Sequence, residues 1–318
     1  MTPSAQRSGS IAVTGATGFL GSRIIAELAD RSPAALVRAP VTWLDDARQV
    51  EVDLLDPVER VAEALAGVDT VIHLAGHNEV VAAAEPDRAL TETVLAGHRL
   101  VRAAARARVG RIVYVSTVHV YGAQLVGAAV IDEEVPPAPR SIYAIARLAV
   151  EHLVAATPDA VVLRLTNAVG APVHPDVNRW TLVAADLCRT ATSTGAVVLQ
   201  SSGQQWRDFI ALDDVARIVV AATDPEAVPA GTYNVASGRA ITVRALAELV
   251  QDRVEASTGS RPVLQAPAPT GPDPAPYRVD PGRLAARGLV AEVPISDAID
   301  DIIALCLAHP TTTGALPT

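Results

Sequence analysis

The hydrophobic and polar positions of this chain form two alternating patterns through its first half. Short apolar runs predict β-strands at residues 11–15, 34–38, 50–55, 70–76, 111–117 and 160–166. The segments between them have the apolar spacing of helices, at residues 18–29, 57–67, 88–109 and 143–157. Apolar strands that alternate with helices are typical of a parallel sheet covered on both faces. We therefore predict an α/β fold with a doubly wound parallel sheet, which would bind ligands at the carboxyl ends of its strands.

The alternation loosens in the second half of the chain. Helical patterns are predicted at residues 213–223, within 239–258 and at 296–309, where Ser296 is the expected N-cap. The stretch "APAPTGPDPAP" is a proline-rich loop rather than a linker between independent domains. A chain of 318 residues with this pattern suits one large core that carries a smaller C-terminal lobe.

Composition and charge narrow the classes of function. The net charge is −9, whereas proteins that bind duplex nucleic acid are more often basic, so we expect no nucleic-acid partner. Cys188 and Cys306 are too few for a disulfide scaffold or a cysteine-based metal site, and we expect no metal. No apolar run reaches the ~18 residues that a membrane helix needs. The N-terminus also has no apolar stretch of a signal peptide. We expect a cytoplasmic protein that does not contact a membrane.

A glycine-rich turn, "TGATGFLG", occupies residues 14–21 between the first predicted strand and the first predicted helix. Its glycines, Gly15, Gly18 and Gly21, recur at a spacing of three residues. Glycine allows a tight turn and a close approach of the backbone to a pyrophosphate, which a helix N-terminus favours. The turn therefore predicts a dinucleotide site on a Rossmann-type sheet.

Six further segments complete a family pattern around this turn. They are "DLLD" (53–56), "VIHLAG" (71–76), "YVSTVHVYG" (114–122), "RLTNAVG" (164–170), "RDFIALDDVA" (207–216) and "YNVASG" (233–238). Together with the turn, they resemble the extended short-chain dehydrogenase/reductase family, the NAD(P)-dependent epimerases, dehydratases and reductases. The resemblance runs nearly end to end.

The resemblance implies a division of the chain into two parts. Residues 1–167 would form the dinucleotide-binding Rossmann core, with further core elements from about 207–238. Residues 168–318 would mainly form the smaller substrate-binding lobe, in which 310–318 are expected to be a disordered tail. The family usually forms homodimers through two helices, here at roughly 88–108 and 143–156.

The resemblance also implies which residues bind the cofactor. They are Gly15, Thr17, Gly18, Phe19, Leu20, Gly21, Arg38, Asp53, Leu54, Leu74, Ala75 and Gly76. NAD sites need an acidic residue at the end of the second strand for the ribose 2′-hydroxyl, whereas NADP sites prefer arginine. The chain has Arg38 there without an adjacent carboxylate, so we expect NADP in preference to NAD.

A threonine, a tyrosine and an arginine stand at the family's catalytic positions. In the family a tyrosine transfers the substrate proton and a serine or threonine hydrogen-bonds the reacting oxygen. A lysine binds the nicotinamide ribose and lowers the pKa of the tyrosine. Thr117, Tyr143 and Arg147 match these places, with arginine instead of lysine. Residues four apart share one face of a helix, so Arg147 would lie beside Tyr143.

The arginine retains the charge of the lysine and changes its shape. A unit charge at about 4 Å stabilises a phenolate by roughly 4 kcal/mol at an effective dielectric of about 20. Arginine is always protonated, but its guanidinium is planar and bulkier than an ammonium group. The chain contains no lysine, which favours a general replacement of lysine over a targeted loss of activity. We expect activity to be retained; the alternative is an inactive NAD(P)-binding regulatory module.

Four residues bear on the reaction and the substrate. Val118 and His119 follow Thr117 where the family's 4,6-dehydratases carry Asp-Glu, which disfavours a dehydratase. His119 is a candidate substrate contact, or a polar residue that only lines the cleft. Asn167 and Arg207 match positions that hold the diphosphate of a nucleotide sugar, and arginine suits bidentate phosphate binding.

These matches predict an enzyme that acts on a small molecule, and they favour a nucleotide sugar as that substrate. The leading interpretation is an NAD(P)-dependent sugar-nucleotide epimerase or 4-ketoreductase that uses Tyr143 as acid and base. The family's second phosphate-binding arginine is missing from its usual element, where the chain reads "TGPD". A reductase of a small or natural-product ketone is therefore the alternative among enzymes.

Overall fold

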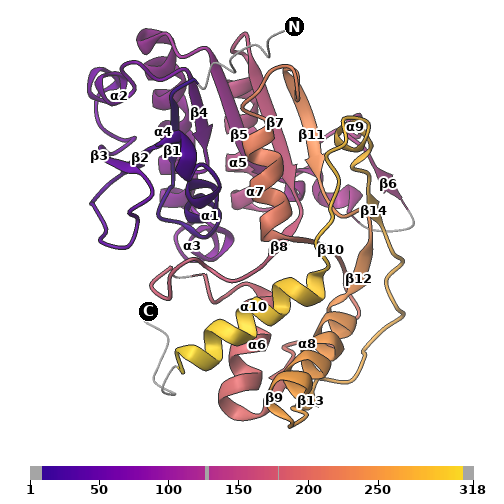
Figure 1. Ribbon diagram of the computed structural model, residues 1–318. Coiled ribbons are helices and arrows are strands. Elements are labelled where there is room, and N and C mark those ends of the chain that lie inside the picture. Colours follow the sequence, from indigo (N-terminus) through magenta and orange to yellow (C-terminus); the bar gives the residue numbers. More distant parts are fainter. Residues whose placement is uncertain (1–8, 126–128, 178, 311–318) are drawn as a thin grey trace, which may run out of the picture. The chain divides into compact units, whose positions relative to one another are not determined.

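The chain forms two compact units in the computed structural model, which describes residues 9–125, 129–177 and 179–310 (Figure 1). The expected disordered tail lies outside the described residues, apart from residue 310. The first unit combines Met1–Gly122, Pro137–Arg164 and Ala216–Tyr233. The second combines Ala123–Pro136, Leu165–Val215 and Asn234–Thr318. Each unit therefore draws on several separate stretches of the sequence.

A seven-stranded sheet forms the centre of the first unit, in the order β11-β7-β5-β4-β1-β2-β3. Its strands are β1 (Ile11–Thr14), β2 (Ala34–Val37), β3 (Arg48–Glu51), β4 (Thr70–His73), β5 (Arg111–Thr117), β7 (Ala160–Leu165) and β11 (Gly231–Val235). The pairings from β3 through β2, β1 and β4 to β5 are parallel, which confirms the predicted parallel sheet. The strand order reverses at β1, so the carboxyl ends of β1 and β4 flank the switch point at which such sheets bind ligands.

The third strand ends earlier than the sequence predicts. The run at residues 50–55 predicts a strand throughout, but β3 ends at Glu51. Two aspartates turn the chain after it. The Asp53 carboxylate accepts a hydrogen bond from the Leu55 amide (2.8 Å), and the Asp56 carboxylate accepts one from the Asp53 amide (3.2 Å). Aspartate favours such turns because its side chain replaces a backbone acceptor.

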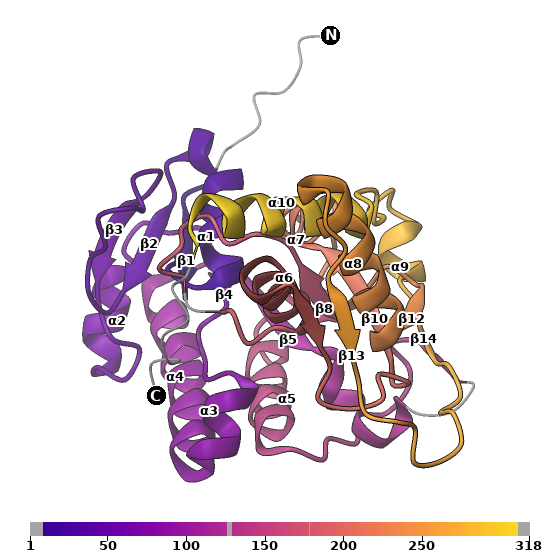
Figure 2. The same ribbon diagram turned by 90° about the horizontal axis from the view of Figure 1, so that it is seen from below.

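Helices cover both faces of this sheet (Figures 1 and 2). One face carries α2 (Val58–Ala64), α4 (Pro86–Ala107) and α5 (Ile142–Ala155), and the other carries α1 (Phe19–Glu27) and α7 (Leu212–Ala221). The short helices are η1 (Ala29–Arg31), α3 (Glu79–Ala84) and η2 (Val118–Gln124). Helices α4 and α5 approach closely because Gly97 has no side chain; a Cβ atom there would lie 2.8 Å from the Val150 methyl groups.

Three helices and several small sheets build the second unit. The helices α6 (Val183–Thr194), α8 (Val243–Thr258) and α10 (Ile295–Ala308) pack on one another around their own core, which includes Cys188 and Cys306 as buried free thiols. The strands pair as β8 (Asn167–Val169), β10 (Trp206–Ala211) and β12 (Ala240–Thr242), as β9 (Ala196–Val198) and β13 (Val263–Gln265), and as β6 (Val130–Ile131) and β14 (Arg278–Val279). The short helix α9 (Gly282–Ala285) follows β14.

The last helix begins before its predicted N-cap. The sequence predicts Ser296 as the N-cap, but α10 begins at Ile295 and Pro294 takes the N-cap position. The Ser296 hydroxyl instead hydrogen-bonds the Asp297 carboxylate (2.9 Å). Asp297 lies in the first turn, where a negative charge is stabilised by the helix dipole. The N-cap prediction was therefore wrong.

A buried hydrogen-bond network ties the end of β1 to the end of β4. The Thr14 hydroxyl accepts hydrogen bonds from the amides of Leu74 (3.2 Å) and Ala75 (3.3 Å), and it lies 2.8 Å from Nδ1 of His73. Because the hydroxyl accepts from both amides, its own proton is free to be donated to the His73 ring. The ring is fully buried and stacks on Tyr114, with centroids 5.3 Å apart. Burial, and after it the charge of Arg147, lowers the pKa of His73 from 6.5 to about 3.

We predict that His73 makes the fold acid-sensitive. Below pH 6.5 the unfolded chain binds a proton at this histidine and the folded chain does not, so stability falls with pH until about pH 3. The free energy of unfolding should fall by about 2 kcal/mol from this source between pH 7 and pH 5. Denaturant titrations of the wild type and of His73→Phe at both pH values measure it, because the difference between the two proteins isolates His73 from other titrating groups.

The exposed His152 is the matched control for this measurement. His152→Asn should keep the wild-type dependence on pH, whereas His73→Phe should flatten it. Equal pH dependence in the wild type and His73→Phe would contradict a neutral, buried His73.

Candidate active site

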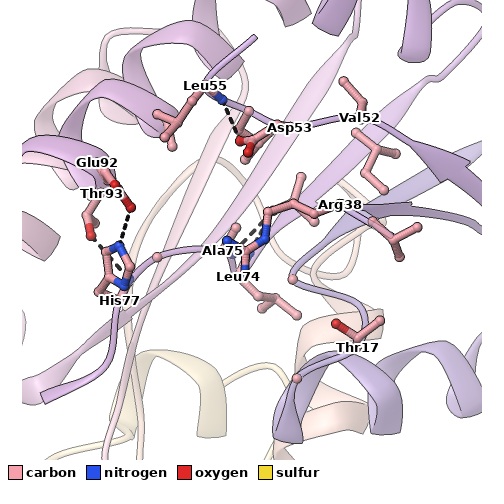
Figure 3. Close-up of a pocket in the computed structure, with 18 residues that line it drawn as sticks. Thr17, Arg38, Val52, Asp53, Leu55, Leu74, Ala75, His77, Glu92 and Thr93 are labelled. Atoms are coloured by element: carbon pink, nitrogen blue, oxygen red, sulfur yellow. Dashed lines mark hydrogen bonds and ion pairs between the residues drawn. The ribbon is translucent and has the colours of Figure 1, made fainter. Parts of the chain in front are cut away.

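A pocket of about 320 Å³ opens at the carboxyl ends of the strands in the first unit (Figure 3). Its lining comes from the turn after β1, the ends of β2, β3 and β4, and the start of α4. The lining residues are Thr14, Gly15, Thr17, Gly18, Leu36, Val37, Arg38, Val52, Asp53, Leu54, Leu55, Leu74, Ala75, Gly76, His77, Glu92, Thr93 and Ala96. Nine of the twelve predicted cofactor residues are among them; Phe19, Leu20 and Gly21 are not.

The glycine-rich turn forms one wall of this pocket. Gly15 has a φ of +69°, and a Cβ atom there would lie 2.9 Å from the amide nitrogen of Ala75. Gly21 is also required, because its Cβ atom would lie 2.1 Å from the Gly15 carbonyl oxygen. Gly21 therefore lets α1 pack on the turn rather than facing the pocket. Gly15 thus allows the turn to lie close to the backbone that follows β4.

Helix α1 begins beside the pocket without a capping group. Its N-cap is Gly18, which offers no side-chain hydrogen bond, and no acidic residue stands in its first turn. The first amides of a helix carry partial positive charge and lack intrahelical partners. An uncapped helix start of this kind fits a pyrophosphate, as the sequence predicts.

Arg38 and Asp53 lie on the opposite side of the pocket from His77, Glu92 and Thr93 (Figure 3). Arg38 is exposed directly after β2, and Asp53 is half-buried in the turn after β3. One Asp53 oxygen is engaged by the Leu55 amide, so the carboxylate has a fixed orientation. A cation and a carboxylate therefore stand together at this end of the pocket, between apolar residues.

Helix α4 contributes Glu92, Thr93 and Ala96 to the pocket, and none of them is among the predicted site residues. Nε2 of His77 lies 2.7 Å from the Glu92 carboxylate, and the Thr93 hydroxyl accepts from the His77 amide (3.2 Å). The hydrogen bond with His77 holds the pKa of Glu92 below its usual range. Thr93 stands where the family usually has asparagine, and its hydroxyl ties α4 to the segment after β4. These contacts depend on how α4 packs on the sheet, which sequence spacing does not define.

Arg147 adjoins the pocket at Gly76. Its guanidinium is buried, and its Cζ lies 3.2 Å from the position that a Cβ atom of Gly76 would take. Burial opposes the charge, but interactions with Tyr114 and Tyr143 raise the pKa of Arg147 on balance. Nε of Arg147 has no hydrogen-bond partner within the described residues, and no carboxylate there pairs with the guanidinium. The arginine is thus a buried cation with unused donor capacity.

Tyr143, Thr117 and His119 form a second group around Arg147. The Arg147 Cζ atom lies 5.5 Å from the centroid of the Tyr143 ring, so the two side chains share one face of α5. The His119 ring meets the Tyr143 ring edge-on, with centroids 6.3 Å apart. The Thr117 hydroxyl accepts a hydrogen bond from the His119 amide (3.2 Å). The exposed His119 therefore joins the end of β5 to the tyrosine.

Asn167 and Arg207 lie on neighbouring strands of the second unit. Asn167 pairs with Phe209 in the β8–β10 ladder, and its side-chain amide donates to the Asp208 carbonyl (2.8 Å). Arg207 is half-buried beside Tyr277. Burial raises the pKa of the Tyr277 phenol, although the positive charge of Arg207 acts to lower it. The structure thus brings the two predicted substrate residues onto one small sheet.

The described residues contain no cluster of three or more histidine, cysteine, aspartate and glutamate side chains arranged to hold a metal ion. None of their helices combines the length and the apolar character needed to cross a membrane.

Comparisons with known proteins agree with this geometry. A dTDP-6-deoxy-L-talose 4-dehydrogenase (NAD(P)(+)) from Kitasatospora kifunensis is 34% identical over 280 residues, which cover 83% of this chain and 84% of that protein. A GDP-6-deoxy-D-mannose reductase from Pseudomonas aeruginosa is 32% identical over 76% of this chain and 78% of that protein. The solved structure of MoeE5 in complex with UDP-glucose and NAD matches with a TM-score of 0.79 and 26% identity, over 95% of this chain and 100% of that one.

The family described as the NAD dependent epimerase/dehydratase family matches residues 11–236. This match covers more than half of the chain and includes the glycine-rich turn, the end of β5 and helix α5. It confirms the resemblance to the extended short-chain dehydrogenases/reductases that the sequence indicates. The chain belongs to the NAD dependent epimerase/dehydratase family.

Proposed function

We propose that the protein is an NAD(P)-dependent sugar-nucleotide epimerase or 4-ketoreductase. The observation that carries the proposal is the buried guanidinium of Arg147, which lies between Gly76 of the pocket and the ring of Tyr143. The activities of the two relatives support it, since one is a 4-dehydrogenase and the other a reductase, both of nucleotide-linked 6-deoxy sugars. An inactive module would not need a buried cation directed at a tyrosine.

The pocket of the first unit would hold the dinucleotide. The uncapped start of α1 and the turn at Gly15 fit a pyrophosphate, and Asp53 and Leu54 lie where an adenine would be bound. When bound, the dinucleotide accepts or supplies hydride. Arg147 would direct its unused donors towards the nearby ribose, since its guanidinium reaches the pocket at Gly76. We therefore assign dinucleotide binding to the first unit.

Tyr143 would transfer the proton that accompanies hydride transfer. In the direction of reduction its hydroxyl donates a proton to the substrate oxygen, and in the direction of oxidation its phenolate removes one. The Arg147 cation stabilises that phenolate, and a unit charge at about 4 Å is worth roughly 4 kcal/mol at an effective dielectric of about 20. The Thr117 hydroxyl, held by the His119 amide, would hydrogen-bond the reacting oxygen.

The second unit would recognise the substrate. Arg207 can bind a diphosphate through paired N–H donors, and Asn167 on the adjacent strand can add a neutral donor. His119, in the first unit, is a separate candidate for a substrate contact. These assignments make the substrate a nucleotide sugar and leave the base and the sugar to be found by experiment.

We predict that Arg147 and Tyr143 act together in turnover. The wild type should convert a member of a panel of dTDP-, GDP- and UDP-linked sugars and 4-keto sugars with NAD(H) or NADP(H). Arg147→Ala should lower kcat by about 100- to 1000-fold, because the phenolate loses most of roughly 4 kcal/mol of stabilisation. Arg147→Lys should stay within about tenfold of the wild type, because it keeps the charge. Tyr143→Phe should lose activity.

The exposed Arg140, which precedes α5, provides the control. Arg140→Ala should retain wild-type kcat. Full activity of Arg147→Ala would refute the role of the arginine. Absence of turnover across the panel by a wild type that still binds the dinucleotide would favour the regulatory module, and turnover of simple ketones alone would favour the alternative reductase.

We further propose that Arg38 makes NADP the preferred cofactor. Arg38 stands exposed at the end of β2 on the rim of the pocket, where it can pair with a ribose 2′-phosphate. A hydrogen-bonded pair with a charged group contributes about 1.5–3 kcal/mol. Arg38→Asp should therefore weaken NADPH binding by roughly 10- to 100-fold and leave NADH binding equal or tighter.

Fluorescence titration of both reduced dinucleotides measures this preference. Arg102→Asp makes the same charge change at an exposed position of α4 that does not line the pocket. An equal loss of NADPH affinity in both variants would show a general charge effect. Unchanged affinity in Arg38→Asp would remove Arg38 from the site.

We also propose a homodimer that forms through α4 and α5. These helices pack side by side on one face of the sheet, and Ile145 on α5 is 40% exposed. Sedimentation equilibrium should give twice the chain mass of 33.0 kDa, and Ile145→Arg should shift the protein towards the monomer. A monomeric wild type at micromolar concentration would contradict this proposal.

A further inference from the structure

A buried ion pair lies beneath the proposed reaction site. Arg164 on β7 binds Glu151 on α5 through two nitrogens, with Nη2–Oε2 at 2.8 Å and Nε–Oε2 at 3.1 Å. The side chains are only 8% and 5% exposed. Neither residue lines the dinucleotide pocket. The pair therefore serves some purpose other than direct contact with the cofactor.

Arg164 also contacts the segment that follows Thr117. Its Cζ atom lies 4.9 Å from the centroid of the Tyr121 ring, and Tyr121 is fully buried within η2. Segment η2 begins directly after β5, so it carries the chain on from Thr117 through His119 to Tyr121. The guanidinium thus links β7, on which it stands, to α5 and η2, and the three residues in contact, Arg164, Glu151 and Tyr121, belong to the first unit.

The spacing along α5 relates this contact to the reaction site. Tyr143, Arg147 and Glu151 succeed one another at intervals of four residues, so they share one face of the helix. Arg147 contacts Tyr143 at one end of this row, and Glu151 is held by Arg164 at the other. The rotation of α5 about its axis, which aims the tyrosine, is therefore restrained by the ion pair.

The energetics of buried ion pairs favour such a positioning role over a stabilising one. Desolvation of both charges offsets most of their attraction, and apolar replacements of such pairs are often as stable as the original. What a bidentate pair adds is a defined geometry. We propose that Arg164 and Glu151 are positioning residues that hold Tyr143 and Arg147 in register with Thr117. This inference rests on the proposed function of Tyr143.

The test compares variants that keep the fold. Glu151→Met with Arg164→Met removes both charges and retains the bulk of the side chains, so no unpaired charge remains buried. We expect its melting temperature to stay near that of the wild type. Its kcat should fall by about 10- to 100-fold, because a small misplacement of the reacting groups slows the reaction by this much. The KM for the dinucleotide should change less than twofold or so, since the pocket residues are untouched. Glu151→Gln should lower kcat as well, measured at a temperature at which the variant is folded.

Arg111 and Asp159 provide a matched ion pair in the same unit. Arg111 at the start of β5 is 3% exposed and lies 2.7 Å from the Asp159 carboxylate, at the amino ends of the strands and away from the site. Asp159→Asn should lower the melting temperature and leave kcat unchanged. A folded double variant with wild-type kcat would overturn the inference, as would an equal loss of kcat in Asp159→Asn.

Hydrogen–deuterium exchange separates this inference from the proposed function. The double variant should exchange faster in the first turns of α5 and in η2 than the wild type, and Asp159→Asn should not. If the wild type turns over no substrate, the proposed function fails and the exchange pattern alone decides on positioning. Unchanged exchange in α5 and η2 would overturn the inference even in an active enzyme.

Discussion

The buried cation of Arg147, which has no carboxylate partner among the described residues, constrains the groups that surround it in the first unit. Moving a charge out of water costs several kcal/mol unless an opposite charge or hydrogen bonds offset it. The chain surrounds the Arg147 guanidinium with the ring of Tyr143 and the bare backbone of Gly76, and it leaves Nε without a partner among the described residues. Interactions with Tyr114 and Tyr143 nevertheless raise the pKa of Arg147 on balance, so the two phenols offset the cost of burial. In the function that we propose, the unused Nε donor would bind a ribose hydroxyl.

The effect of this cation extends to the glycine-rich turn. The Tyr114 hydroxyl donates to the Arg147 carbonyl (3.4 Å), and its ring stacks on His73. A second positive charge beside the guanidinium is unfavourable, which together with burial keeps His73 neutral. Only the neutral ring can accept a proton from Thr14, and Thr14 in turn holds the amides of Leu74 and Ala75. The Arg147 cation and the backbone after β4, which lines the pocket, are therefore connected through buried contacts.

The sequence alone predicted the structural elements that are determined by residues close to one another along the chain. Apolar strands alternating with amphipathic helices predicted the parallel sheet, and the glycine spacing predicted the turn, because both depend on neighbouring residues. Contacts across the fold were not predictable in this way. His77 and Glu92 come from different elements, and the bond between Arg164 and Glu151 depends on how α5 is rotated on β7. The end of β3 was also missed, since the turn at Asp53 interrupts a run that reads as a strand.

The arginine of α5 also shows how a substitution can be accommodated by its surroundings. A guanidinium is wider than the ammonium group of the family's lysine, so the larger group needs additional space. Gly76 provides that space, because a Cβ atom there would lie 3.2 Å from Cζ and 3.3 Å from Nη1 of Arg147. Gly76 also has a φ of +148°, a conformation that glycine adopts readily. The room at Gly76 and the charge of the guanidinium would thus together allow arginine to take the place of lysine in the site that we propose.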